Sequence, residues 1–362
     1  MTASTTTESP LLRMAQHTPT VLWNDSADPR ELSEAISWGA VGATCNPVIA
    51  LTALKADAPT WVTRIREYAA ANPTATEDEI GWAMVRRLSI DAAALLEPAF
   101  ERYAGRNGRL SIQTDPRNYR NAEALAAEAI QFSTLAENMI VKIPVTEAGI
   151  PAFEEATYRG VSINATVSFT VPQAIAVAEA VERGLRRREA EGLDISAMGP
   201  VCTIMVGRTD DWMRASAEKE SITVDPGITE WAGVAVFKKA YRIYQERGYR
   251  TRLLSAAFRN HMHWSQFIGG DVVISPPFGW QQRINGSGIE PSHRLDDPVD
   301  PRIVEDLYDN FEEFRKAYDE DGLTPAEFTT YGATVRTLRQ FLAANNELEA
   351  FVRDVTLPNP DK

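Results

Sequence analysis

Eight short apolar segments recur along the chain, and each has the composition of a strand that is buried on both faces. Each is at most eight residues long, is rich in Val, Ile or Leu, and has Gly, Pro or Asn nearby. Such runs predict parallel strands in the interior of an α/β protein. The predicted strands are residues 20–25, 41–46, 109–114, 139–144, 160–166, 201–207, 251–258 and 271–276.

Amphipathic segments separate most of these strands. Ala, Leu and Glu recur in them at helical spacing, which predicts helices over Pro29–Trp38, Asn121–Ala136, Val171–Arg188 and Ile228–Gln245. Strands that alternate with helices eight times are typical of a (β/α)8 barrel. The predicted fold class is therefore α/β, a TIM barrel.

Three segments lie outside a minimal barrel. The Ser/Thr-rich N-terminus, residues 1–17, is expected to be flexible, and residues 18–362 are expected to form one barrel domain. We expect a helical insert over about 52–105, after the second strand, and a C-terminal helical extension over about 295–357 that ends in a long helical run, Pro325–Val355. We interpret these additions as helices packed outside the barrel; a lid over the site or an oligomer surface is the alternative, and a homo-oligomer stays possible.

The charge balance restricts the partners. The chain has 362 residues, with 50 Asp and Glu against 37 Lys and Arg, and its net charge is −13. A surface of that sign repels phosphate backbones and anionic lipid, so we expect neither nucleic acid nor a membrane as a partner. An anionic substrate would need a local basic site. The hydrophobic share of 44% and the charged share of 24% are globular values, which argue against disorder.

Cysteine and histidine content argues against common metal and disulfide frameworks. Cys45 and Cys202 are the two cysteines, too few for a disulfide framework and without zinc-ligand spacing. The histidines form no H-E-x-x-H pattern, and His261 and His263, two residues apart, are interpreted as structural. No apolar run reaches the about 18 residues of a membrane span, and the N-terminus lacks the features of a signal peptide. We expect a soluble, cytoplasmic protein without a metal.

Polar residues end or follow nearly every predicted strand. In a barrel, the chemistry is carried by side chains at the carboxyl ends of the strands. A hydrophobic core would exclude such residue types, so their repetition predicts a site at this end. The candidates are Asp25, Asn46, Gln113, Lys142, Asn164, Thr166, Thr203, Arg208, Ser255, Arg259 and Ser275.

Lys142 is the most informative of these residues. It lies inside the apolar segment MIVKIP, where burial would disfavour the charged ammonium and lower its pKa. A neutral amine that faces a ketone forms an imine, which acts as an electron sink for C–C bond cleavage without a metal. The alternative is a lysine at a strand edge whose stem reaches solvent.

The other candidates each have a functional and a structural interpretation. Asp25 would serve as a general acid or base near the lysine, or as a helix cap. Asn46 would bind substrate hydroxyls or cap a loop. Arg208 and Arg259 would hold a phosphate bidentately, or form surface salt bridges.

Five motifs connect these residues to a known family. The chain resembles the transaldolase family from about residue 18 to 285, because motifs typical of that family occur in its order. The motifs are GATCNP at 42–47, MIVKIPVTEAG at 139–149, INATVSF at 163–169, VGRTDDW at 206–212 and SAAFRN at 255–260.

The resemblance implies a Schiff-base enzyme of the pentose phosphate pathway type that transfers a dihydroxyacetone unit between sugar phosphates and needs no cofactor. By motif match, Lys142 would form the imine and Asp25 would handle the proton of the hydroxyl at the cleaved bond. Asn46 and Asn164 would bind the dihydroxyacetone hydroxyls, and Thr166 would help to hold the catalytic water.

The remaining matches concern the phosphate end of the substrate. Arg208 and Arg259 match the arginines that bind phosphate, and Thr203 and Ser255 complete the candidate substrate-binding set.

The chain departs from the transaldolase pattern at three positions. Gln113 stands where a glutamate usually positions the water; glutamine can orient a water but cannot act as its base. Ala257 replaces a phosphate-binding serine, which removes a hydrogen bond typically worth about 1.5–3 kcal/mol to a charged acceptor. Met205 replaces an aromatic residue, and the related fructose 6-phosphate aldolases, which share Gln113, have a tyrosine there.

These departures leave three hypotheses. The first is a transaldolase, the second is an aldolase that releases free dihydroxyacetone, and the third is a barrel that binds sugar phosphates without turnover. The chain follows neither subfamily fully, so the donor sugar, the acceptor sugar and the role of the C-terminal helices stay open.

Overall fold

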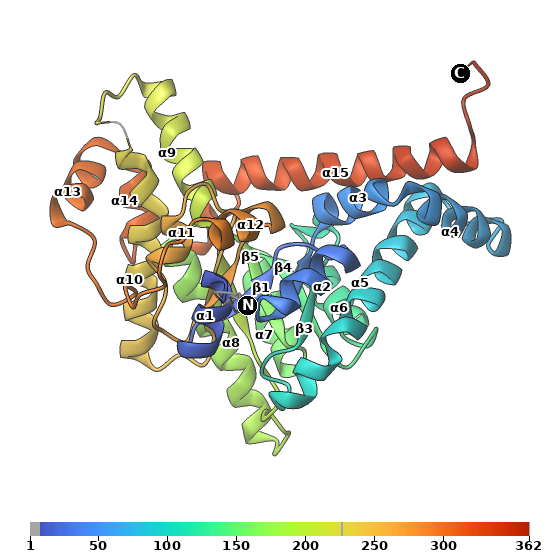
Figure 1. Ribbon diagram of the computed structural model, residues 1–362, viewed down its shortest axis with the longest axis horizontal. Coiled ribbons are helices and arrows are strands. Elements are labelled where there is room, and N and C mark those ends of the chain that lie inside the picture. The colour runs from blue at the N-terminus through green and yellow to red at the C-terminus, as the bar shows by residue number, and fades with distance from the viewer. Residues whose placement is uncertain (1–7, 226, 362) are drawn as a thin grey trace, which may run out of the picture.

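Eight parallel strands form a closed barrel with the order β1-β2-β3-β4-β5-β6-β7-β8. The computed structural model describes residues 8–225 and 227–361 (Figure 1). The predicted (β/α)8 architecture is confirmed, and every strand lies within two or three residues of its predicted position. The strands are β1 (Val21–Asn24), β2 (Ala40–Cys45), β3 (Arg109–Gln113), β4 (Met139–Pro144), β5 (Ile163–Ser168), β6 (Val201–Ile204), β7 (Arg252–Ala256) and β8 (Val273–Ser275).

Helices connect consecutive strands and surround the barrel. Local sequence explains where several of them begin: Asp28 accepts hydrogen bonds from the backbone N–H groups of Arg30 and Glu31, and Pro29 occupies the first turn of α2, both typical of a helix start. The connecting helices are α2 (Pro29–Ser37), α6 (Ala122–Ser133), α7 (Gly149–Tyr158), α8 (Val171–Ala190), α9 (Val206–Glu220), α10 (Ala232–Arg247) and α11 (Met262–Ser265), and α12 (Phe278–Gly286) follows β8.

The insert after β2 consists of three helices, α3 (Pro47–Ala56), α4 (Ala58–Ala71) and α5 (Glu77–Arg102). Thr76 and Glu79 form a capping box at the start of α5, which satisfies two backbone donors that the first turn leaves free.

The N-terminus differs from its prediction where the structure describes it. Pro10–His17 form helix α1, capped by Ser9, and Leu11 and Met14 are fully buried. The sequence-based expectation did not include this helix, which is favoured by a cap, a first-turn proline and two apolar residues one turn apart. Residues 1–7 lie outside the described residues.

The C-terminal helices occupy two places. Helices α13 (Pro301–Asn310) and α14 (Glu312–Tyr318) contact α10, outside the barrel, as expected. Helix α15 (Gly332–Thr356) begins seven residues later than the predicted helical run, because Pro325–Glu327 form a separate 3-10 turn. Helix α15 contacts α3, α4 and α5 as well as α9 and β5, so it crosses the carboxyl end of the barrel like a strap (Figure 1, red).

The barrel interior is filled below its carboxyl end. Trp23, Ile140, Val201, Leu254, Ala256 and Val273 form an apolar cluster separate from the core between strands and helices. Gly42 makes room for it, since a Cβ there would lie 2.5 Å from the Trp23 indole. Within residues 8–225 and 227–361, no helix is long and apolar enough to cross a membrane.

Candidate active site

The strand register places Lys142 inside the barrel mouth. It is paired with Gln113 of β3 on one side and with Asn164 of β5 on the other, and register partners on adjacent parallel strands point to the same face. Ile140, two residues before Lys142, belongs to the interior cluster. Lys142 therefore projects inward just above that cluster, with 3% of its surface exposed.

Burial lowers the pKa of Lys142, and the nearby Arg208 guanidinium lowers it further, whereas Asp25 raises it. Desolvation is the largest of these effects because it penalises the charged ammonium. The geometry thus favours a neutral, nucleophilic amine in the mouth of the barrel. The neighbouring Cys45 thiol is no competitor as a nucleophile, since burial raises its pKa to about 12 and keeps it protonated.

Asp25 follows β1 directly and faces the same space. The Thr44 hydroxyl donates a hydrogen bond to its Oδ1 atom. Asp28, not Asp25, caps the following helix, so the structural alternative for Asp25 is set aside. The sequence analysis did not select Thr44. It lies two residues after Gly42 and therefore on the same inner face of β2, where it is paired with Ser111.

Asn164 is held rigidly by two hydroxyl groups. Its Nδ2 atom donates to Ser111 Oγ at 3.1 Å, and its Oδ1 atom accepts from Thr203 Oγ1 at 2.8 Å. All three side chains are buried. Thr203, a predicted substrate-binding residue, therefore acts on Asn164, and Ser111 is a further supporting residue that the sequence analysis did not select.

Other polar atoms of the mouth are buried without a partner among the described residues. They include Gln113 Oε1, Thr166 Oγ1 and Ser275 Oγ. Buried polar atoms of this kind are costly unless they bind something. Gln113 and Thr166 are thus available to a ligand beside Lys142, as their predicted roles require.

Two predicted substrate ligands have structural contacts instead. Asn46 Oδ1 accepts a hydrogen bond from the Ile49 backbone N–H at 3.0 Å and caps α3 at the rim of the mouth. Ser255 lies on the outer face of β7, because its neighbours Leu254 and Ala256 point inward. Its hydroxyl donates to the carbonyl of His263 at 3.2 Å. The structure thus directs the Ser255 hydroxyl away from the side chains that face Lys142.

The two predicted phosphate ligands converge on one small cavity. Arg208 lies in the first turn of α9 and Arg259 follows β7, and both line a cavity of about 50 Å³. Arg259 Nε and Nη2 lie 2.9 Å and 2.8 Å from Asp211 Oδ2. Burial, followed by repulsion from Arg259, lowers the pKa of Arg208 to about 10, so the Arg208 guanidinium stays charged at neutral pH.

A buried histidine positions the loop that carries Arg259. His263 Nδ1 accepts the backbone N–H of Arg259 at 3.0 Å, so its Nε2 carries the proton and donates to Asp210 Oδ2 at 2.8 Å. Burial raises the pKa of Asp210, and the hydrogen bond from His263 opposes this rise. The contacts of His263 are thus structural, and they fix the loop that carries Arg259, a predicted phosphate ligand.

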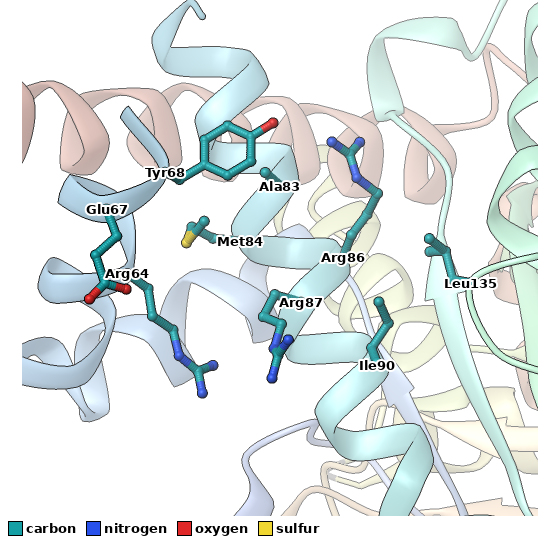
Figure 2. A pocket seen from close by; sticks show the side chains of 9 residues that line it. All are labelled: Arg64, Glu67, Tyr68, Ala83, Met84, Arg86, Arg87, Ile90 and Leu135. Atoms are coloured by element: carbon teal, nitrogen blue, oxygen red, sulfur yellow. The ribbon is translucent and has the colours of Figure 1, made fainter. Parts of the chain in front are cut away.

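A solvent-accessible cavity outside the barrel lies away from Lys142. It measures about 710 Å³ and is open to solvent between α4 and α5 (Figure 2). Figure 2 shows the guanidinium groups of Arg64 and Arg87 on one side and that of Arg86 on the other. Arg64 and Arg87 both pair with Asp91. Within the described ranges, no three His, Cys, Asp or Glu side chains converge as metal ligands do.

Comparison with known proteins places this site in context. Residues 22–324 match the family described as transaldolase/fructose-6-phosphate aldolase. Transaldolase 2 of Streptomyces avermitilis is 34% identical over 209 residues, which cover 57% of this chain and 55% of that protein. Transaldolase 1 of Streptomyces coelicolor is 30% identical over 254 residues, 68% of this chain and 65% of that protein. The aligned regions thus span about half to two thirds of these relatives.

Proposed function

Because the chain belongs to the transaldolase/fructose-6-phosphate aldolase family, we propose that it is a transaldolase that moves a dihydroxyacetone unit from a ketose phosphate to an aldose phosphate through an imine on Lys142. The observation that carries this proposal is the buried Lys142 amine, held in register between Gln113 and Asn164 with a lowered pKa.

The reaction begins with attack of the neutral Lys142 amine on the keto carbon, and loss of water gives a protonated imine. Asp25 then takes the proton from the hydroxyl beside the bond to be broken, the C–C bond breaks, and an aldose phosphate leaves. The electron pair of that bond moves into the imine and gives an enamine on Lys142. The enamine attacks the carbonyl carbon of the incoming aldehyde, and the aldehyde oxygen takes the proton from Asp25. Hydrolysis of the imine then releases the new ketose.

The fixed neighbours supply orientation. Asn164, held by Ser111 and Thr203, can present its amide to the dihydroxyacetone hydroxyls without losing side-chain entropy on binding. Gln113 and Thr166 have buried oxygen atoms available to orient the water that leaves when the imine forms and the water that later hydrolyses it. Arg208 and Arg259 would hold the phosphate, which the net charge of −13 of the whole chain would otherwise repel.

Borohydride trapping tests the proposal directly. Incubation with fructose 6-phosphate and borohydride is expected to reduce the imine and label Lys142, and Lys142→Met should abolish both the label and turnover. Lys238 is a matched control, because burial also lowers its pKa, to about 8, yet its Nζ donates to Gln266, Arg294 and Asp297 far from the mouth. Lys238→Met should retain both. A label on Lys238, or none on Lys142, would reject the mechanism.

Gln113 supports a second candidate, an aldolase that releases free dihydroxyacetone. Its side chain can orient a water but cannot deprotonate it. Release of dihydroxyacetone requires the enamine carbon to take up a proton and the resulting imine to be hydrolysed, and this route competes with attack of the enamine on an aldehyde. This candidate predicts dihydroxyacetone from fructose 6-phosphate without an added aldehyde. Turnover that strictly requires an acceptor favours the transaldolase, and binding without any turnover favours a non-catalytic sugar-phosphate-binding barrel.

We also propose that the protein acts in the cytoplasm. Cys45 and Cys202 are both free and buried, which is the usual state of cysteines in a reducing compartment.

A further inference from the structure

We propose that Arg336 on α15 is a third arginine that binds the substrate phosphate. Its guanidinium would compensate for the hydrogen bond that Ala257 cannot make. The inference rests on the proposed function, because it concerns the phosphate end of the same substrate. Residues 22–324 match the family, so Arg336 comes from a segment beyond the matched region.

The cavity beside Arg208 and Arg259 is closed by α15. Four of its lining residues, Ala333, Arg336, Thr337 and Gln340, lie on one face of that helix. Its volume of about 50 Å³ is several times the roughly 10–15 Å³ that one water molecule requires. The space is therefore sufficient for a tetrahedral oxyanion at the end of a longer substrate.

The charges that face this cavity sum to the charge of a phosphate monoester with the opposite sign. Arg208, Arg259 and Arg336 line it together with one carboxylate, Asp211, which leaves two positive charges. Asp211 is further neutralised by Arg214, whose Nη2 lies 2.6 Å from Asp211 Oδ1. Phosphate monoesters carry about −1.5 to −2 charges at pH 7, and arginine is the side chain best suited to bind them.

Ala257 explains why a third ligand is needed. It lies in the left-handed region at φ 63°, beside the loop that His263 fixes, at the position where the family motif has a serine. An alanine there offers no hydroxyl to the phosphate. The Arg336 guanidinium can donate charge-assisted hydrogen bonds into the cavity that Arg208 and Arg259 line, and these are stronger than a bond from a neutral hydroxyl.

Helix α15 is held firmly enough to place Arg336. Gly332 packs directly on the Trp212 ring, where a Cβ would lie 1.9 Å from a ring carbon. Arg208 Nη1 donates to Thr337 Oγ1 at 3.1 Å and to Gln340 Oε1. Arg336 lies close enough to Arg208 to lower its pKa, as expected of cations that share one anion-binding space.

The test compares two glutamine substitutions on the same helix. Arg336→Gln removes the proposed ligand, and Arg339→Gln is the matched control, because Arg339 is also exposed and its replacement changes the net charge equally. Binding of inorganic phosphate, measured by titration calorimetry, is expected to weaken about tenfold or more in Arg336→Gln and to stay within about twofold of the wild type in Arg339→Gln. Equal effects of the two substitutions would overturn the proposal.

Kinetics and a rescue variant complete the test. The KM for fructose 6-phosphate should rise in Arg336→Gln by more than the KM for unphosphorylated fructose, and adding Ala257→Ser to Arg336→Gln should recover phosphate binding. Failure of that rescue, or equal KM changes for both ketoses, would count against the proposal. Phosphate binding needs no imine, so a loss of binding in Arg336→Gln supports the site even if Lys142 forms no adduct, in which case only the proposed function fails.

Discussion

Replacing Glu128 with glutamine is expected to stabilise the protein at pH 8 by more than it does at pH 5. Glu128 lies on α6 and supports the loop that follows β3, since its Oε2 atom accepts the Asp115 backbone N–H at 2.8 Å. Burial raises the pKa of Glu128 from 4.5 to about 7, although the hydrogen bond from the Asp115 backbone lowers it in part.

The magnitude follows from this shift of 7 − 4.5 = 2.5 units. One unit corresponds to about 1.36 kcal/mol, so ionised Glu128 costs the folded state about 3 kcal/mol. The raised pKa contributes stability that is fully present below pH 4.5 and is lost as the pH rises through 7. Between pH 5 and pH 8 the wild type should therefore lose about 2–3 kcal/mol that the non-titrating glutamine does not lose.

Urea denaturation at pH 5, 6.5 and 8, followed by tryptophan fluorescence, measures this difference. Glu123→Gln is the control, because Glu123 is on the same helix but exposed; its free energy of unfolding should follow the wild type across the pH range. If the curves of Glu128→Gln and wild type stay parallel within about 0.5 kcal/mol, burial of Glu128 does not have the effect assigned to it.

Two further predictions concern the site. His263→Ala should lower the free energy of unfolding by about 2–4 kcal/mol, because it leaves the buried Asp210 carboxylate with one hydrogen bond fewer and opens a cavity. The control His261→Ala, at an exposed position, should change the free energy of unfolding by at most about 0.5 kcal/mol in the same urea titration. Gln113→Glu should raise the pKa of Lys142 by adding a negative charge beside it, so the pH at which borohydride trapping is half-maximal should move upward, and an unchanged midpoint would contradict the register-based placement.

The sequence pattern was sufficient to predict the barrel and to single out Lys142, whose inward placement the structure shows. The strands were found because buried parallel strands are nearly continuous apolar runs, and Lys142 was conspicuous because it interrupts one of them. The pairing of Lys142 with Gln113 and Asn164 was not predicted from the pattern, because it depends on register, which single strands do not specify.

Several contacts of the site were not predicted, for physical reasons. Ser255 was selected because it is polar near a strand end, but the two-residue alternation of a strand puts Leu254 and Ala256 inside and turns Ser255 outward. The contact of His263 with Asp210 joins positions 53 residues apart, and the docking of α15 over the arginines joins even more distant ones. Local patterns carry no signal for either contact.

The tryptophan that fills the barrel beneath Lys142 has a consequence for the fate of the enamine. The Trp23 and Ile140 layer closes the floor of the pocket, so reactants can come only from the strapped end. In the proposed reaction, water and the acceptor aldehyde must then share a single entrance. Transfer occurs when the enamine carbon attacks the aldehyde, whereas release requires that carbon to take up a proton before water adds to the imine carbon. Widening that entrance would speed up hydrolysis and transfer together. Changing the side chains that would orient water, Gln113 and Thr166, would instead shift the balance between release and transfer.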